Sequence, residues 1–151
     1  MAKKTQLGYR EIEERLTEAF VESYTPADEV GYELLYSFGK SERDIERYKE
    51  GKGILKTFDG LLIKGLFGFR DSATFRLTET LEQLKRDIQV QKAAPKIVAV
   101  SDGQRLLAYD LREKETYENP LNRLPCDFAF FYPLMDVERV RYVEENPADI
   151  K

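Results

Sequence analysis

The chain has 151 residues, the length of a single domain, and 42% of them are hydrophobic, so it can bury a core. Its 24 basic residues against 28 acidic ones give a net charge of -4, which excludes a histone-like basic module but allows a local basic patch. One cysteine, Cys126, and the lack of histidine exclude a disulfide framework, a structural zinc site and histidine-based catalysis. Any chemistry therefore depends on carboxylates, lysines, tyrosines or a bound hard cation.

The sequence carries no targeting or membrane signal. The N-terminal residues lack an apolar signal core. The longest apolar stretch, from Phe128 to Met135, is far shorter than the roughly 20 residues of a membrane span. We therefore expect a soluble, cytoplasmic protein.

The first third of the chain shows helical periodicity. Apolar residues at helical spacing predict a helix from Tyr9 to Tyr24, which Pro26 ends. The stretch from Val30 to Phe38 fits either a strand or a second helix, and its glutamate and leucines favour the helix. The charged, locally basic segment from Lys40 to Lys56 is typical of a solvated loop or an exposed helix face.

The middle of the chain predicts strands and one long helix. Short apolar runs separated by glycines between Ile54 and Phe69 indicate paired strands, and an amphipathic helix is expected from about Thr74 to Lys92. A buried strand from Lys96 to Val100, the turn Asp102-Gly103 and a returning strand from Gln104 to Leu111 predict a hairpin. The order of these elements implies an α/β or α+β fold with a mixed central β-sheet flanked by helices.

The last part of the chain predicts a polar loop, an aromatic run and a new helix. The dense aromatics from Phe128 to Tyr132 favour core packing or a domain interface over the stacking of nucleobases. Asn146-Pro147-Ala148-Asp149 has the cap, proline and acid that begin a helix. We predict one domain over residues 1–145 and the start of a connector helix over residues 146–151, in a piece of a longer protein.

Two glycine-bearing motifs are weak signals. Gly39-Lys40-Ser41 matches the end of a phosphate-binding P-loop, but Leu34 stands where that loop needs its first glycine, so we reject a nucleotide triphosphatase. Gly51-Lys52-Gly53 is a basic loop that could meet a phosphate backbone, although such a motif is more often a surface turn.

The most informative pattern lies in the middle of the chain. Asp59 precedes one predicted strand, Lys64, Gly68 and Arg70 lie around the next, Gln83 lies on the long helix, and the segment PKIVAVSDGQRLLAYDL follows. This order resembles the PD-(D/E)xK nuclease domain of restriction-modification proteins, in particular the N-terminal region of type IIG fusions of an endonuclease with an adenine-N6 methyltransferase. The segment FAFFYPLMDVERVRYVEENPADIK resembles the link into the methyltransferase of those fusions.

The resemblance implies a restriction-endonuclease-like fold and a metal-dependent chemistry. In that family two carboxylates on adjacent strands hold Mg²⁺ against the scissile phosphate, and a lysine stabilises the developing charge. Asp59 matches the first carboxylate, but Gly68 and Arg70 stand where the family has the second acid and the lysine. Cleavage would need substitutes for these groups, and the chain offers a nearby lysine and three carboxylates: Lys64, Asp71, Glu79 and Glu82.

Three hypotheses from different classes follow. The leading one is a degenerate nuclease-like domain that helps an adjoining DNA methyltransferase engage DNA without cutting it, with S-adenosylmethionine bound only in that following domain. The second is an active Mg²⁺-dependent endonuclease, in which Asp59 holds the metal and Asp59, Lys64 and Arg70 act in catalysis. The third is a protein-interaction domain unrelated to DNA. The predicted DNA contacts are three lysines of the charged segment and two cations near the nuclease-like pattern: Lys49, Lys52, Lys56, Lys64 and Arg70.

Overall fold

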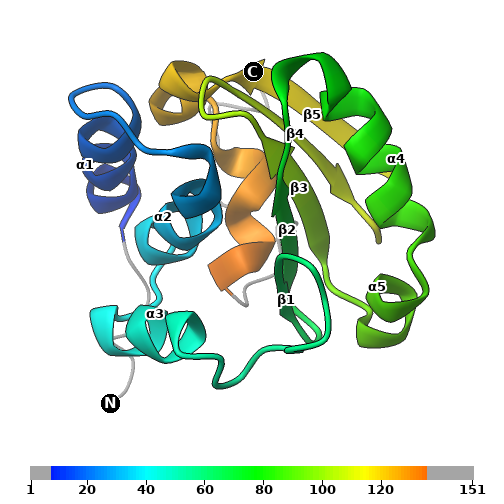
Figure 1. Cartoon of the computed structure of the whole chain (residues 1–151). Coiled ribbons are helices and arrows are strands. Elements are labelled where there is room, and N and C mark those ends of the chain that lie inside the picture. Colours follow the sequence, from blue (N-terminus) through cyan, green and yellow to red (C-terminus); the bar gives the residue numbers. More distant parts are fainter. Residues whose placement is uncertain (1–7, 136–151) are drawn as a thin grey trace.

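One mixed β-sheet with helices on both faces forms the centre of the protein (Figure 1). The computed structural model describes residues 8–135. Five strands lie in chain order across the sheet; β2 and β3 are parallel, and every other neighbouring pair is antiparallel. The predicted α/β class with a mixed central sheet is confirmed. The strands are β1 (Leu61–Ile63), β2 (Phe67–Asp71), β3 (Ile97–Ser101), β4 (Arg105–Asp110) and β5 (Glu115–Pro120).

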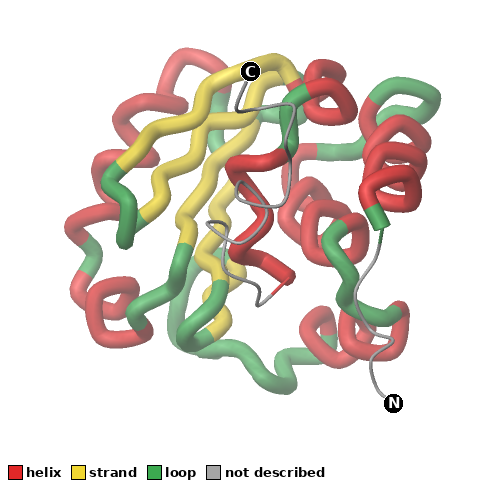
Figure 2. Tube along the Cα trace, turned by 180° about the vertical axis from the view of Figure 1, so that it is seen from behind, coloured by secondary structure: helices red, strands yellow, loops and turns green. Residues whose placement is uncertain are grey.

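Three α-helices and two short 3₁₀ helices cover one face of the sheet (Figure 2). Apolar residues at helical spacing on the first helix, such as Ile12 and Leu16, are fully buried in the larger of two cores. The aromatic run joins this core, because Phe128 and Phe131 pack their rings against Phe38. The expected packing role of that run is confirmed. The helices are α1 (Tyr9–Phe20), α2 (Val30–Ser37), α3 (Glu42–Lys49), η4 (Leu121–Cys126) and η5 (Ala129–Met135), with η2 (Ala27–Glu29) before α2.

The opposite face is covered by the crossover between the parallel strands β2 and β3. It consists of η3 (Thr74–Arg76), α4 (Leu77–Arg86) and α5 (Ile88–Ala93), whose apolar residues form the second core with Val98 and Val100. The prediction of a single helix from Thr74 to Lys92 is therefore wrong. Asp87 interrupts it with an extended backbone (φ -65°, ψ 130°), and its side chain accepts hydrogen bonds from two backbone N–H groups of α5.

Other boundaries differ from the predictions in smaller ways. The first helix ends at Phe20 and not at Tyr24, and the hydroxyl of Thr25 then donates a hydrogen bond of 2.7 Å to the main-chain oxygen of Ala19. The helical reading of Val30–Phe38 is confirmed by α2, and the charged segment contains α3. Ile54-Leu55 is no strand, although the Leu55 N–H donates to the Leu62 carbonyl across 2.9 Å.

The predicted polar loop after the hairpin contains β5, which the sequence did not reveal. It is an edge strand, and Tyr117 is its one buried residue, so it lacks the apolar alternation that marks a strand. The hairpin before it is confirmed: Asp102 Oδ1 accepts hydrogen bonds of 2.8 Å from the N–H groups of Gln104 and Arg105, and Gly103 has a φ of 94°.

Two further predictions concern the connector helix and membrane spans. The connector helix expected to begin at Asn146–Asp149 lies outside the described residues. Within residues 8–135, no helix is both long and apolar enough to cross a membrane.

Candidate functional site

The β1–β2 hairpin brings Asp59 and Arg70 together. Leu61 pairs with Phe69, so the residues just before β1 lie beside the end of β2. Arg70 Nε donates a hydrogen bond of 2.8 Å to the main-chain oxygen of Asp59, whose side chain is exposed. The two residues that the sequence pattern assigned to one site are therefore neighbours in the fold.

The guanidinium of Arg70 is held on three sides. It lies 4.8 Å from the centre of the Phe58 ring, and Nη2 is 4.0 Å from Asp87 Oδ2. Only 19% of its side chain is exposed. We call Phe58, Asp59, Arg70 and Asp87 the Arg70 site. Its centre is a planar guanidinium, which differs in shape and hydrogen bonding from the lysine that the nuclease motif uses.

Gly68 stands two residues before Arg70 on the same face of the strand. A Cβ atom at this position would lie 3.2 Å from Val98 Cγ1 and 3.3 Å from Leu62 Cδ1. Both neighbours belong to the second core and are fully buried. The position where the motif needs its second carboxylate is therefore enclosed by apolar side chains.

Two of the three acids proposed as displaced ligands form ion pairs with cations of their own helical segment. Glu79 forms an ion pair with Arg76 at 3.1 Å, and Glu82 forms one with Lys85 at 3.0 Å. Asp71 is exposed at the end of β2. Among residues 8–135, no group of three or more acids and cysteines is arranged to hold a metal ion.

Lys64 lies in the β1–β2 turn, at the end of the hairpin away from Asp59. It lines a pocket of about 580 Å³ between that turn, the loop before β1 and helix α5. We define this lysine pocket by three apolar and three polar side chains: Ile54, Leu55, Ala93, Lys64, Gln89 and Lys92. Lys92 was not predicted as a site residue, because a lysine near the end of an amphipathic helix has no local signal that distinguishes it from a solvated one.

The three lysines predicted from the charged segment differ in their surroundings. Lys49 Nζ is 2.9 Å from Glu29 Oε1 and 5.1 Å from the centre of the Tyr32 ring, and the hydrogen bond with Glu29 raises the pKa of Lys49. Lys52 pairs loosely with Glu50 at 3.4 Å on the surface. Lys56 is exposed and, like Lys64 and Lys92, has no ion pair within the described part of the chain.

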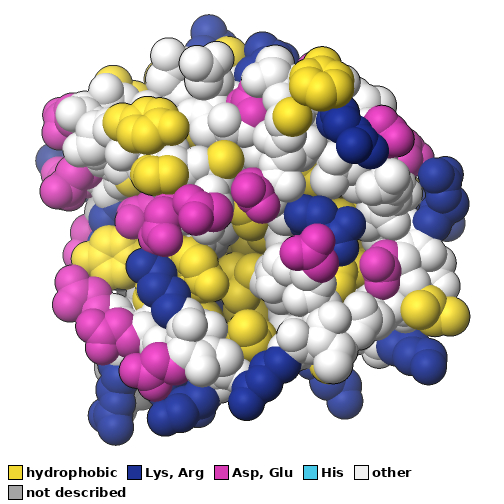
Figure 3. Space-filling model, in the orientation of Figure 1, with side chains coloured by type: hydrophobic (Ala, Val, Ile, Leu, Met, Phe, Trp, Pro, Cys, Tyr) yellow, Lys and Arg dark blue, Asp and Glu magenta, His cyan; other side chains and the backbone are white. Residues whose placement is uncertain are grey.

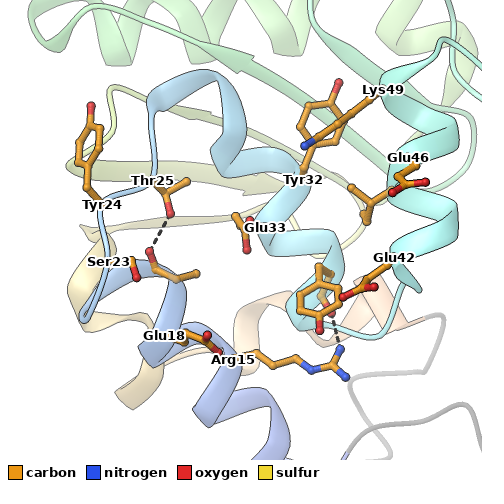
Figure 4. Close-up of a pocket in the computed structure, with 13 residues that line it drawn as sticks. Arg15, Glu18, Ser23, Tyr24, Thr25, Tyr32, Glu33, Glu42, Glu46 and Lys49 are labelled. Carbon is orange, nitrogen blue, oxygen red and sulfur yellow. Dashed lines mark hydrogen bonds between the residues drawn. The ribbon is translucent and has the colours of Figure 1, made fainter.

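A second pocket, of about 530 Å³, lies between α1, α2 and α3 (Figure 4). Glu33 of α2 points into this acidic pocket, which Glu18 borders from α1 and Glu42 and Glu46 border from α3. Burial raises the pKa of Glu33, and nearby Lys49 opposes this increase. The sequence did not indicate this pocket, because its acids come from three separate helices.

Acidic and basic side chains are unevenly distributed over the surface. Figure 3 shows acidic groups gathered over α1–α3 and basic groups along the lower edge, below α3 and α5. Arg15, which lines the acidic pocket, contacts Tyr36: its Nη1 donates a hydrogen bond of 2.9 Å to the Tyr36 carbonyl, and its guanidinium lies 4.3 Å from the centre of the Tyr36 ring. On the face that Figure 3 shows, a polyanion would therefore meet least repulsion at the lower edge, where α5 borders the lysine pocket.

Comparison with known proteins assigns the chain to a family. Residues 9–151 match the family model described as MmeI, N-terminal domain. DNA methyltransferase A of Bacillus subtilis (strain 168) is 29% identical over 121 residues, which are 80% of this chain and 14% of that protein. No solved structure gives a significant match. Since the family model covers almost the whole chain, the chain belongs to the MmeI N-terminal domain family, and its resemblance to restriction-modification proteins is confirmed at that level.

Proposed function

We propose that this domain helps a DNA methyltransferase of its parent protein to engage DNA, and that it does not cut the DNA itself. The observation that carries the proposal is that Arg70, at the centre of the Arg70 site, and Gly68 stand at the motif positions of a lysine and an acid. The match to a methyltransferase in Bacillus subtilis supports the choice of parent. S-adenosylmethionine would then bind in the methyltransferase and not in this domain.

The absence of cleavage follows from the chemistry of Mg²⁺ binding. Mg²⁺ needs oxygen ligands in near-octahedral geometry, and Gly68 supplies none. The guanidinium of Arg70 lies beside the main chain of Asp59 with little access to water, and it would repel a divalent cation placed there. Asp59 and Asp87, the two carboxylates of the Arg70 site, would therefore hold Mg²⁺ weakly at best.

The proposed DNA surface is the basic lower edge. Lys56, Lys64 and Lys92 have no ion pair within residues 8–135, so their charges are available to phosphates. Lys52 contributes at the margin, since its pair with Glu50 is exposed and easily exchanged. We leave Lys49 out of this surface because Glu29 neutralises its charge.

DNA binding and cleavage by the 151-residue chain can be tested in one series. Fluorescence anisotropy with labelled duplex DNA should show binding that weakens with salt. The Lys56→Ala, Lys64→Ala double variant should reduce the slope of log K against log salt by about 2. A control that removes Arg10 and Arg123, exposed cations on α1 and η4, should keep the slope of the wild type.

The same samples with Mg²⁺ or Mn²⁺ and supercoiled plasmid should contain no nicked product. Metal-dependent nicking that disappears in Asp59→Ala would refute the non-cutting role and favour the nuclease. A lack of any salt-dependent affinity for DNA would refute the DNA-engaging role and favour a protein-interaction domain.

A further inference from the structure

We propose that the lysine pocket holds one unpaired nucleotide of bound DNA, with phosphates on Lys64 and Lys92 and the base against Ile54, Leu55 and Ala93. This inference rests on the proposed function, because it names the part of the DNA that the basic edge contacts. It goes further by assigning a nucleotide site to the far end of the hairpin from Asp59.

Hydrogen bonds join the walls of the pocket to one another. The Leu55 N–H donates to the Leu62 carbonyl at 2.9 Å and fixes the loop to β1. The Gly65 N–H donates to the Ala93 carbonyl at 2.8 Å and fixes the β1–β2 turn to the end of α5. Gln89 Nε2 donates to Thr57 Oγ1 at 2.6 Å and connects α5 back to the loop. The pocket is therefore preformed, which lowers the entropic cost of binding a ligand.

The lining of the pocket fits an anion with an apolar body. Lys64 and Lys92 bring two positive charges, and no acidic side chain lines the pocket. Ile54, Leu55 and Ala93 provide apolar walls, and a volume of about 580 Å³ lies in the usual range for small-molecule sites. Gln89 keeps its amide oxygen as an acceptor while its nitrogen bonds to Thr57. A nucleotide combines the phosphate, the apolar ring faces and the hydrogen-bonding edge that these groups match.

The pocket continues the proposed DNA surface, which favours a nucleotide of DNA over a free one. Lys56 follows the pocket loop, and the same loop leads on to Asp59 in the Arg70 site. A base inside an intact duplex is covered by stacking and pairing, so its ring faces cannot reach the apolar walls. The nucleotide in the pocket must therefore be unpaired, either at a strand end, at a mismatch or swung out of the helix.

Two DNAs that differ at one position test this inference. Anisotropy titrations of the 151-residue chain compare a fully paired duplex with the same duplex carrying one unpaired internal nucleotide. The wild type should bind the second DNA about tenfold more tightly. Leu55→Ser should abolish this preference, and its side chain is exposed enough (40%) for the fold to survive. Ile88→Ser, an exposed apolar residue of α5 outside the pocket, should keep the preference.

The lysines are tested by the Lys64→Ala, Lys92→Ala double variant. It should lower affinity for both DNAs by about tenfold or more at low salt, whereas the Arg10→Ala, Arg123→Ala control should not. Equal wild-type affinity for the two DNAs, or a preference that survives Leu55→Ser, would overturn the nucleotide site while leaving the proposed function intact. A chain that binds neither DNA would overturn both.

Discussion

Arg70 Nε donates a hydrogen bond of 2.8 Å to the main-chain oxygen of Asp59, and its guanidinium also faces Asp87 at the start of α5. One side chain thus ties together the segment before β1, the end of β2 and the break between α4 and α5. These contacts give Arg70 a structural role in holding the three segments together.

Replacing Arg70 should therefore lower stability more than replacing an exposed arginine. Arg70→Met keeps the aliphatic stem but removes the hydrogen bond to Asp59, and we expect a loss of about 1–3 kcal/mol in the free energy of unfolding. Arg76→Met removes an exposed ion pair with Glu79 and should change it by less than about 1 kcal/mol. Urea unfolding followed by circular dichroism measures both; equal effects would contradict the structural role of Arg70.

An acid at position 68 should destabilise the fold without creating a metal site. Gly68→Glu would place a carboxylate between Leu62 and Val98 in the second core, and we expect a loss of about 2 kcal/mol or more. Gly68→Ala adds only a methyl group in tight contact and should cost less than about 1 kcal/mol. Urea unfolding compares the two. A Gly68→Glu variant as stable as the wild type would show that the apolar enclosure opens readily.

Glu33 makes the stability of the α1–α3 side depend on pH. Burial raises the pKa of Glu33 above its ordinary value of 4.5, so ionisation disfavours the folded state. The stability that the protonated Glu33 contributes to the folded state is fully present below pH 4.5, and it is lost as pH rises through the folded-state pKa. Glu33→Gln should therefore be more stable than wild type at pH 7, by less than about 1 kcal/mol because the group is half exposed.

Thermal unfolding of both proteins between pH 3.5 and 7.5 (about 4 units, spanning the titration of a carboxyl group) would follow this difference. The stability advantage of Glu33→Gln should shrink as pH falls, and it should vanish once Glu33 of the wild type is protonated in both the folded and the unfolded state. A gain of the same size at every pH would mean that the substitution acts through packing and not through charge.

Asp102 should hold the β3–β4 hairpin together through its acceptor oxygens. Burial opposes its ionisation, but hydrogen bonds from the N–H groups of Arg105 and Gln104 and from the Thr74 hydroxyl outweigh this and lower its pKa below 3.8. Asp102→Ala should cost about 1–2 kcal/mol at pH 7. Asp102→Asn keeps one acceptor oxygen and should cost less. Urea unfolding at pH 7 compares the three proteins; a neutral alanine variant would contradict the capping role.

The wild type should lose the contribution of Asp102 as pH falls through its lowered folded-state pKa, since the protonated group is a weaker acceptor. The difference between wild type and Asp102→Ala is expected to be complete above pH 3.8 and to decrease below it.

Local patterns predicted the parts of the fold that depend on neighbours in sequence. Apolar periodicity predicted α1, and the Asp102-Gly103 turn predicted the hairpin, because each depends on residues that are close in sequence. The break at Asp87 was missed because apolar spacing continues across it from Leu84 to Ile88. Its cause is a side-chain cap, which a periodic pattern does not report.

Features built from distant segments could not be predicted in the same way. The proximity of Asp59 and Arg70 was anticipated only because the family resemblance assigned both to one site on adjacent strands. The lysine pocket combines the loop before β1, the β1–β2 turn and α5, so Lys92 joins Lys64 only in the folded chain. The ion pair of Lys49 with Glu29 also forms between separate elements, so the sequence could not show that the charge of Lys49 is neutralised.

The most direct measurement for a non-cutting domain is calorimetric titration of Mg²⁺ or Mn²⁺ into the wild type and Asp59→Ala. The proposed non-cutting role predicts identical heats for the two proteins at millimolar metal, because the guanidinium of Arg70 would repel a divalent cation beside Asp59. Binding in the wild type that is lost in Asp59→Ala would contradict this account: a second ligand would complete a metal site, and the nuclease would become the leading hypothesis.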